Sequence, residues 1–181
     1  GVAEGDISGA INIANASTGT LVLNSGAGAG AYTMIGAGGL NWDGNKSGII
    51  TLPDVSSASI SGGGTGADAF AQLGHGGSLS NGNITNGAIT LNATAGGVSV
   101  VGGAGDNSYA KIGAGGIGEG GSPSTGDFVG GAAVNVQATG AVTLTSGAGA
   151  NSFTQIGAGG ANLTTDFAAS AVTVQTTTGN I

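Results

Sequence analysis

The sequence of 181 residues contains no cysteine, no arginine and only two lysines, Lys46 and Lys111. The lack of cysteine excludes a disulfide framework. Nine acidic residues give a formal net charge of −7. So few cations cannot neutralise the phosphates of a nucleic acid or bind an anionic lipid surface. No stretch of the sequence approaches the roughly 18 consecutive apolar residues of a membrane-spanning helix. We therefore expect neither a nucleic-acid partner nor direct insertion into a membrane.

Proline and aromatic residues are scarce too, whereas glycine contributes 42 residues. Collagen needs glycine at every third position together with much proline, and this chain has two prolines and no such period. Disordered chains combine low hydrophobicity with high net charge, but 39% of this chain is hydrophobic and only 6% is charged. Glycine-rich runs such as 36–39 would cost a helix about 1 kcal/mol per glycine. An all-β fold is the class that remains.

Two sequence patterns recur along the chain. The first is aromatic–(Thr/Ala)–x–(Ile/Leu)–Gly–(Ala/His)–Gly–Gly, and its copies begin 38, 39 and 44 residues apart, at Tyr32, Phe70, Tyr109 and Phe153. The second is β-branched–x–aliphatic, and its copies begin at Ile11, Ile50, Ile89, Val134 and Val172. The patterns interleave, so a repeat of about 39 residues divides into two units of about 19 to 20. The extra residues of the third copy fall in a Gly/Ser/Pro-rich loop near 118–131.

Apolar residues alternate within each unit, as in Val98 and Val100, which is the signature of a β-strand. A unit this short cannot bury a core alone, so neighbouring units must stack. We predict an all-β, right-handed parallel β-helix, or β-solenoid, that spans residues 1–181 as a single segment. The prediction is roughly nine coils of about 19 to 20 residues, with the five β-branched starting residues in one internal column.

The blocks Phe70–Gly77 and Tyr109–Gly116, within coils rich in Gly, Ala, Ser, Thr and Asn, resemble repeats of β-helical exoproteins. These are the filamentous-haemagglutinin-like proteins of the two-partner-secretion type. The resemblance implies a secreted protein of the bacterial cell surface or extracellular matrix, such as an adhesin or a biofilm filament. Its partners would be more copies or a continuation of the same solenoid, and extracellular glycans or the surface of a host or neighbouring cell. Since neither end carries a polar cap, we expect the solenoid to continue at both ends.

Three functions are compatible with a β-solenoid of this composition. The first is a non-enzymatic structural shaft or adhesive segment of a surface or matrix fibre, without a cofactor. The second is a module that binds glycans or other fibres through exposed aromatic and asparagine side chains. The third is a solenoid carbohydrate-active enzyme, for which acids must project into one groove. Acids such as Asp43 and Asp166 occur in different contexts, so we predict no catalytic residue.

The aromatic residues are the candidate binding residues: Tyr32, Trp42, Phe70, Tyr109 and Phe153. Strand alternation places Phe153 and Gln155 on one face. Gln155 occupies a position that is Met34, Gln72 or Lys111 in other copies, so we expect that position to face solvent. The aromatic column then forms an outward stripe with one ring every second coil. The alternative is a corner directly after the ring, which makes the column an internal stack.

Asp68 is a weak candidate calcium ligand, because Gly63–Ala71 matches the pattern Gly-Gly-x-Gly-x-Asp-x-apolar-x. Calcium takes six to eight oxygen ligands, but the equivalent positions are Gly30, Asn107 and Asn151. We therefore interpret Asp68 as a turn residue and predict no metal site. His75, which replaces alanine of the other repeats, is interpreted as a half-exposed turn residue.

Overall fold

The structure is a computed structural model that describes residues 5–14, 18–118, 124–125, 128–129, 131–164, 168 and 170–181. These residues form 21 strands and no helix. In this part of the chain there is accordingly no helix that is long and apolar enough to cross a membrane. The strands pair in parallel with strands of neighbouring coils, which confirms the prediction of a parallel β-solenoid.

The strands form four long sheets and two short ones, which are numbered here in the order in which the chain visits them. Sheet 1 contains β1 (Ile7–Ser8), β5 (Lys46–Ser47), β10 (Ile84–Thr85) and β16 (Phe128–Val129). Sheet 2 contains β2 (Ile11–Asn12), β6 (Ile50–Val55), β11 (Ile89–Ala93), β17 (Val134–Ala138) and β21 (Val172–Thr176). Sheet 3 contains β3 (Thr20–Asn24), β7 (Ser57–Ser61), β12 (Val98–Val101) and β18 (Val142–Thr145).

The remaining sheets follow sheet 3 along each coil. Sheet 4 contains β4 (Tyr32–Ile35), β8 (Phe70–Leu73), β13 (Ala110–Ile112) and β19 (Thr154–Ile156). Sheet 5 contains β9 (Gly76–Ser78) and β14 (Gly115–Ile117). The last pair is β15 (Ser124–Thr125) and β20 (Leu163–Thr164). Most of the loop predicted near 118–131 lies outside the described residues.

One coil uses a whole repeat of about 39 residues. The register joins Ile11 to Ile50, Ile50 to Ile89, Ile89 to Val134 and Val134 to Val172, which confirms the predicted column. Its middle members are buried as predicted, whereas Val172 is 47% exposed. The prediction of roughly nine coils of 19 to 20 residues is not confirmed, because the solenoid has about four turns. The two halves of a repeat lie on different sides of one coil: β6 is in sheet 2, whereas β8 is in sheet 4.

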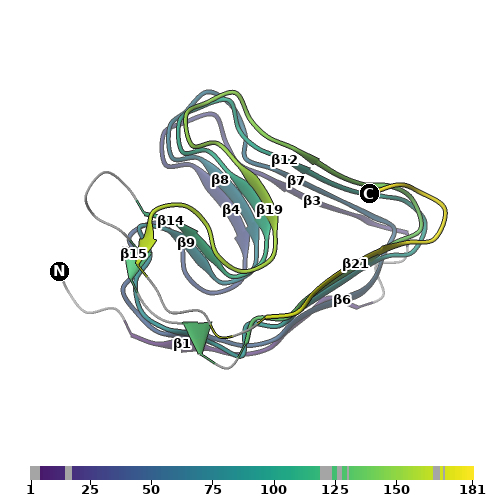
Figure 1. Ribbon diagram of the computed structural model, residues 1–181, viewed down its shortest axis with the longest axis horizontal. Helices are drawn as coiled ribbons and strands as arrows, with labels where there is room; N and C mark the ends of the chain where they lie inside the picture. The colour runs from purple at the N-terminus through teal and green to yellow at the C-terminus, as the bar shows by residue number, and fades with distance from the viewer. Residues whose placement is uncertain are drawn as a thin grey trace.

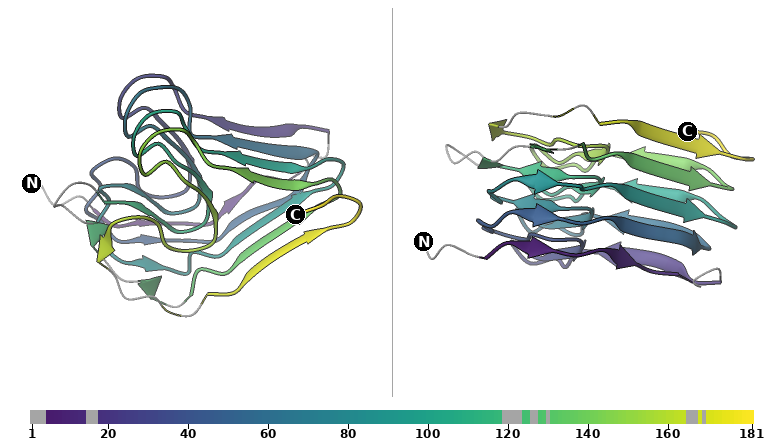
Figure 2. Two further views of the ribbon diagram at one scale, coloured as in Figure 1. Left: turned by 45° about the horizontal axis from the view of Figure 1, so that its top comes forward. Right: turned by 90° about the horizontal axis from the view of Figure 1, so that it is seen from below.

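The coils lie directly above one another (Figure 2). In Figure 1, which looks along the stack, the chain turns counterclockwise as it comes toward the viewer, so the solenoid is right-handed. Sheets 2, 3 and 4 enclose the main core, which contains alternate residues of each strand, such as Ile60, Leu73 and Leu91. In sheets 2 and 3, period-2 alternation puts these apolar side chains inside and their polar neighbours outside.

Sheet 4 is buried on both of its faces, as the four buried residues of β8 illustrate. Ala71 and Leu73 face the main core. Phe70 packs on the opposite face with Tyr109 and Ile117, in a separate cluster that we call the second core. After sheet 4 the chain folds back on itself, and sheet 5 covers this face (Figure 1).

Glycine is required in the turn that joins sheet 4 to sheet 5. Gly74 and Gly113 occupy equivalent positions of successive coils, with φ angles of +150° and +148°. A Cβ atom on Gly74 would overlap the carbonyl of Gly113, and one on Gly113 would overlap the carbonyl of Gly157. The repeated glycines therefore let the backbones of stacked coils touch, in a conformation that other residues rarely adopt.

Candidate functional site

The four aromatic residues of the repeat form one continuous internal stack. Tyr32, Phe70, Tyr109 and Phe153 contribute one ring per coil, with adjacent centroids 5.0 Å apart and planes within 6° of parallel. The rings of Phe70 and Tyr109 are completely buried, whereas Tyr32 at one end is 48% exposed. In the stack, the faces of the rings contact one another instead of water, which stabilises the second core.

The outward stripe is therefore wrong. The column is internal, as in the alternative, but without the predicted corner after the ring, because β8 runs unbroken from Phe70 to Leu73. The aromatic residue and the residue two positions later share one face of the strand, as alternation predicts. The prediction that this face points to solvent is wrong. Gln72 and Lys111, expected to face solvent, are completely buried. The physical reason is the fold-back after sheet 4, which makes an interior on both faces of the sheet. Fully buried rings cannot touch an external ligand, so Phe70 and Tyr109 do not form a binding surface.

Gln72 lies at the centre of a buried hydrogen-bond network. The two hydrogens of its Nε2 are shared among three carbonyl oxygens, each 3.0 Å away: His75 of its own coil, and Gly113 and Gly115 of the next coil. Its Oε1 accepts a hydrogen bond of 3.2 Å from the hydroxyl of Tyr109. The glycine-rich turn thus aims carbonyl groups into the second core, and the amide satisfies them.

Lys111 takes the same position in the next coil. Its ammonium donates to the carbonyls of Ala114 and Gly159, at 2.8 and 2.5 Å. Burial lowers the pKa of Lys111 to about 7, because the charged form loses its hydration. Lys46, the second lysine, is also buried, and its ammonium donates to the carbonyls of Gly44, at 2.7 Å, and Asn81. Both cations of the chain are thus used inside the solenoid.

Gln155 ends this polar column in the last described coil of sheet 4. Its Nε2 donates to the carbonyl of Ala158 at 3.1 Å. Its Oε1 is buried but has no hydrogen-bond partner among the described residues. A pocket of about 360 Å³ opens beside it and is also lined by Phe153, Gly160 and Ala161. This pocket is the open end of the aromatic stack.

His75 is buried, so its interpretation as a half-exposed turn residue is wrong. Its Nδ1 accepts a hydrogen bond from the backbone N–H of Ala37, at 2.9 Å. Its Nε2 lies 3.0 Å from the carbonyl oxygen of Gly48 and donates to it in the tautomer that the first bond requires. Burial lowers the pKa of His75, and the nearby charge of Lys46 lowers it further. The imidazole thus joins turns of the solenoid and has no free nitrogen for catalysis.

Asp68 adopts a left-handed turn conformation with φ of 61°, as its interpretation as a turn residue required. Its carboxylate accepts a hydrogen bond of 3.0 Å from the side-chain amide of Asn107 in the next coil. Asn107 in turn accepts one of 3.1 Å from the amide of Asn151. The described residues contain no cluster of three or more His, Cys, Asp or Glu residues that would hold a metal. The absence of a calcium site stays a prediction.

Other described carboxylates also bind the coil that follows their own. Asp6 accepts from the backbone N–H of Asn45 at 2.9 Å, Asp43 from the amide of Asn81 at 2.7 Å, and Asp106 from the N–H of Ala150 at 2.8 Å. Four acids lie outside the described residues: Glu4, Glu119, Asp127 and Asp166. The described hydrogen bonds of Asp6, Asp43 and Asp106 thus connect coils, which is a structural use of these groups.

Trp42, the predicted aromatic binding residue outside the column, is half-buried. Its carbonyl accepts hydrogen bonds from the N–H of Asn81, at 2.7 Å, and from the hydroxyl of Ser80, at 3.3 Å. Its indole Nε1 is buried without a hydrogen-bond partner in the described part of the chain. Among the predicted binding aromatics, Trp42, Tyr32 and Phe153 keep exposed surface, and their binding role stays a prediction.

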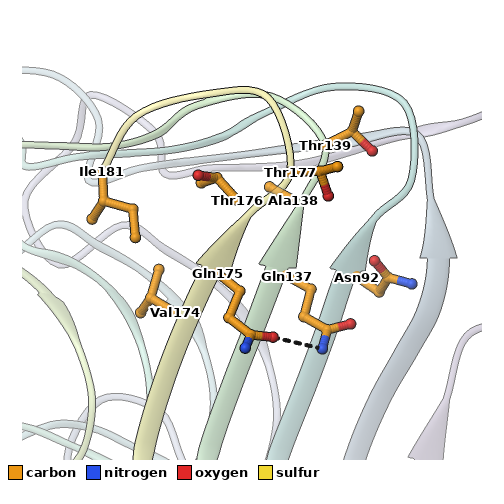
Figure 3. Close-up of a pocket in the computed structure, with 9 residues that line it drawn as sticks. All are labelled: Asn92, Gln137, Ala138, Thr139, Val174, Gln175, Thr176, Thr177 and Ile181. Carbon is orange, nitrogen blue, oxygen red and sulfur yellow. Dashed lines mark hydrogen bonds between the residues drawn. The ribbon is translucent and has the colours of Figure 1, made fainter.

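A polar groove of about 520 Å³ lies at the β21 end of sheet 2, where it is lined by outward side chains and also by Ala138 and Val174 of the core face (Figure 3). Amide side chains from three adjacent strands line it: Asn92 from β11, Gln137 from β17 and Gln175 from β21. Gln137 Nε2 donates to Gln175 Oε1 at 3.2 Å, and Asn92 Nδ2 donates to the carbonyl of Pro53 at 2.9 Å. Sequence reasoning missed this row, although the coil register of about 39 residues aligns its members.

No family model, no curated protein and no solved structure matches the chain.

Proposed function

We propose that the chain is a non-enzymatic shaft or adhesive segment of a secreted fibre on a bacterial surface or in an extracellular matrix. One observation carries the proposal: the interactions of each coil run mainly to the coils above and below it. Backbone pairs, the aromatic stack, the column of Gln72 and Lys111, and the aspartates all connect successive coils. A molecule built in this way is stiff along one axis and extends by adding coils.

The outer surface supports the same proposal. Most outward positions of sheets 2 and 3 carry Ser, Thr, Asn or Gln, as in Thr51, Ser59 and Thr90, and Val22 is an exception. Such a surface stays hydrated without the charge that attracts nucleic acids or anionic lipids. The resemblance of the repeats to filamentous-haemagglutinin-like proteins points to export across the outer membrane and to partners that continue the same solenoid.

The proposal can be tested on material sheared from the surface of cells that make this protein. Antibodies raised against the 181-residue chain should decorate the sides of thin rods in negatively stained preparations. Preparations from cells that lack the gene should contain no decorated rods. Label confined to globular particles would contradict the proposal.

The groove on sheet 2 favours a second candidate function, the binding of an extracellular glycan or of a sister fibre. Its amides of Gln137 and Gln175 can both donate and accept hydrogen bonds, as sugar hydroxyl groups require. On a glycan array, wild-type protein should retain neutral polysaccharides that the Gln137→Ala/Gln175→Ala variant does not retain. Serine substitution of Thr51, away from the groove, is the matched control. Equal retention by all three proteins would contradict this candidate.

A further inference from the structure

The type of aromatic residue in each coil follows from the side chain in the coil below. Tyr109 stacks on Phe70 and lies above Gln72, to which it donates a hydrogen bond. Phe70 lies in the coil above Met34, and Phe153 lies in the coil above Lys111. In these three pairs of stacked coils, a tyrosine lies above a glutamine, and a phenylalanine lies above a methionine or a lysine.

Hydrogen-bond chemistry explains this pairing. A buried phenol hydroxyl needs an acceptor, and glutamine offers Oε1. An ammonium such as that of Lys111 has donors only, and a thioether is a weak acceptor. In reverse, a buried glutamine oxygen needs a donor, and Oε1 of Gln72 finds it in the phenol of the next coil.

Gln155 shares with Gln72 the bond to the turn of its own coil and lacks the bonds that Gln72 makes to the coil above it. Its Nε2 donates to Ala158, as Nε2 of Gln72 donates to His75 three residues further on. Its Oε1 is buried and lacks a partner among the described residues. The pocket of about 360 Å³ beside it has Phe153 as its aromatic wall, in the place that Phe70 takes below Tyr109.

We propose that this pocket is a tyrosine site: it receives the phenol ring of a tyrosine on the solenoid coil that stacks on β19. The ring lies on Phe153 and its hydroxyl donates to Oε1 of Gln155. The inference rests on the proposed function, in which further coils of the same kind continue the shaft. It adds the identity of the residue that the next coil must place there.

The chain itself contains a side chain of the required shape. Tyr32 has the same pose as Tyr109 relative to the Gly-Gly pair of its own coil. A Cβ atom added to the second glycine of that pair would lie 3.0 Å from the tyrosine hydroxyl in both cases, at Gly39 for Tyr32 and at Gly116 for Tyr109. The backbone also offers a register for an added coil. Val142 N–H donates to Asn180 O at 2.9 Å, as Val98 N–H donates to Ala141 O. Ile181 therefore aligns with Val142 and, through the ladder, with Leu21.

A covalent extension tests the proposal. A second copy of residues 22–48, joined directly after Ile181, continues this register and brings a copy of Tyr32 over Phe153. Two versions are compared, one with the added tyrosine and one with phenylalanine in its place. Both versions are also made in a Gln155→Met background, which reproduces the Met34 and Phe70 pair. Thermal unfolding gives the preference, and amide hydrogen exchange shows whether the added coil is ordered.

The added strands should be protected, and the tyrosine version should melt about 2 to 6 °C above the phenylalanine version. In the Gln155→Met background that difference should fall below about 1 °C, because the acceptor is gone. A protected extension with equal melting temperatures in the wild-type background overturns the tyrosine site and leaves the shaft standing. An extension without protection overturns the continuation of the solenoid and the site together.

Discussion

The hydroxyl of Tyr109 donates a hydrogen bond to Oε1 of Gln72, 3.2 Å away in the preceding coil. Both side chains are completely buried in the second core. Backbone pairing between coils is independent of side-chain identity, whereas this bond forms only between a tyrosine and a glutamine in the correct register. A ring stack and a specific hydrogen bond therefore act together at one step between coils.

Tyr109→Phe should lower the free energy of unfolding by about 1 to 2 kcal/mol, because it leaves the buried Oε1 of Gln72 without a donor. In a Gln72→Met background the same substitution should cost under about 0.5 kcal/mol. Chemical denaturation of the four proteins of this cycle measures the coupling. Tyr32→Phe, at the half-exposed end of the stack, is the control and should be nearly neutral. Equal costs in both backgrounds would show that the hydroxyl has another role.

Gly113→Ala should unfold the chain or cost more than about 3 kcal/mol, because the new Cβ would overlap the carbonyl of Gly157 at a φ of +148°. Gly28→Ala is the matched control, since no atom lies within 4 Å of the added Cβ. It should change stability by less than about 0.5 kcal/mol. The melting temperatures of the two variants measure the contrast, and a similar small loss for both would refute the close backbone contact between coils.

Stability should rise with pH through Lys111. Its pKa is 10.5 in the ordinary state and about 7 in the folded chain, so between these values the unfolded chain binds more protons. The free energy of unfolding should therefore rise by up to about 1.4 kcal/mol per pH unit from pH 7 to 10.5, and fall again as the pH returns to 7. Lys111→Gln, which matches Gln72 and Gln155, should remove this slope. Urea unfolding across the range measures it, and identical slopes for both proteins would exclude a titrating buried amine.

Acid should act through His75. Its folded pKa lies below the ordinary 6.5, first because of burial, so the unfolded chain binds more protons as the pH falls below 6.5. Stability present above that value is then lost as the pH falls through the folded pKa. Protonation of Nδ1 would also break its bond with the N–H of Ala37. His75→Ala, the residue of the other coils, should be less stable at neutral pH but lose less stability between pH 6.5 and 5. Parallel losses for both proteins would contradict this role.

The column that starts at Ile11 could be predicted from sequence, because equal spacing places equivalent residues above one another. The size of the coil could not be predicted by counting strands alone, since both halves of a repeat alternate with period 2. The two halves differ in one respect that bears on the coil size: one ends in Gly-x-Gly-Gly after an aromatic, and the other does not. Stacked coils put like residues above like, so this difference favours one coil per repeat.

The direction of the aromatic column was undetermined from sequence because alternation assigns residues to faces without saying which face is covered. The fold-back after sheet 4 covers both, which is why Gln72 and Lys111 are inside. Glycines at identical positions of each repeat are the available signal, since backbone contact between coils demands them. The pairing of tyrosine with glutamine can be read from aligned repeats only once the coil size is known.

Labelling of intact cells tests the central claim, that this chain belongs to the shaft of a surface fibre. Antibodies against the chain would be applied to the cells that make it, before and after permeabilisation, with cells lacking the gene as the control. The account predicts gold label on filaments outside unpermeabilised cells, at the same intensity before and after permeabilisation. Label that appears only after the envelope is opened would contradict it.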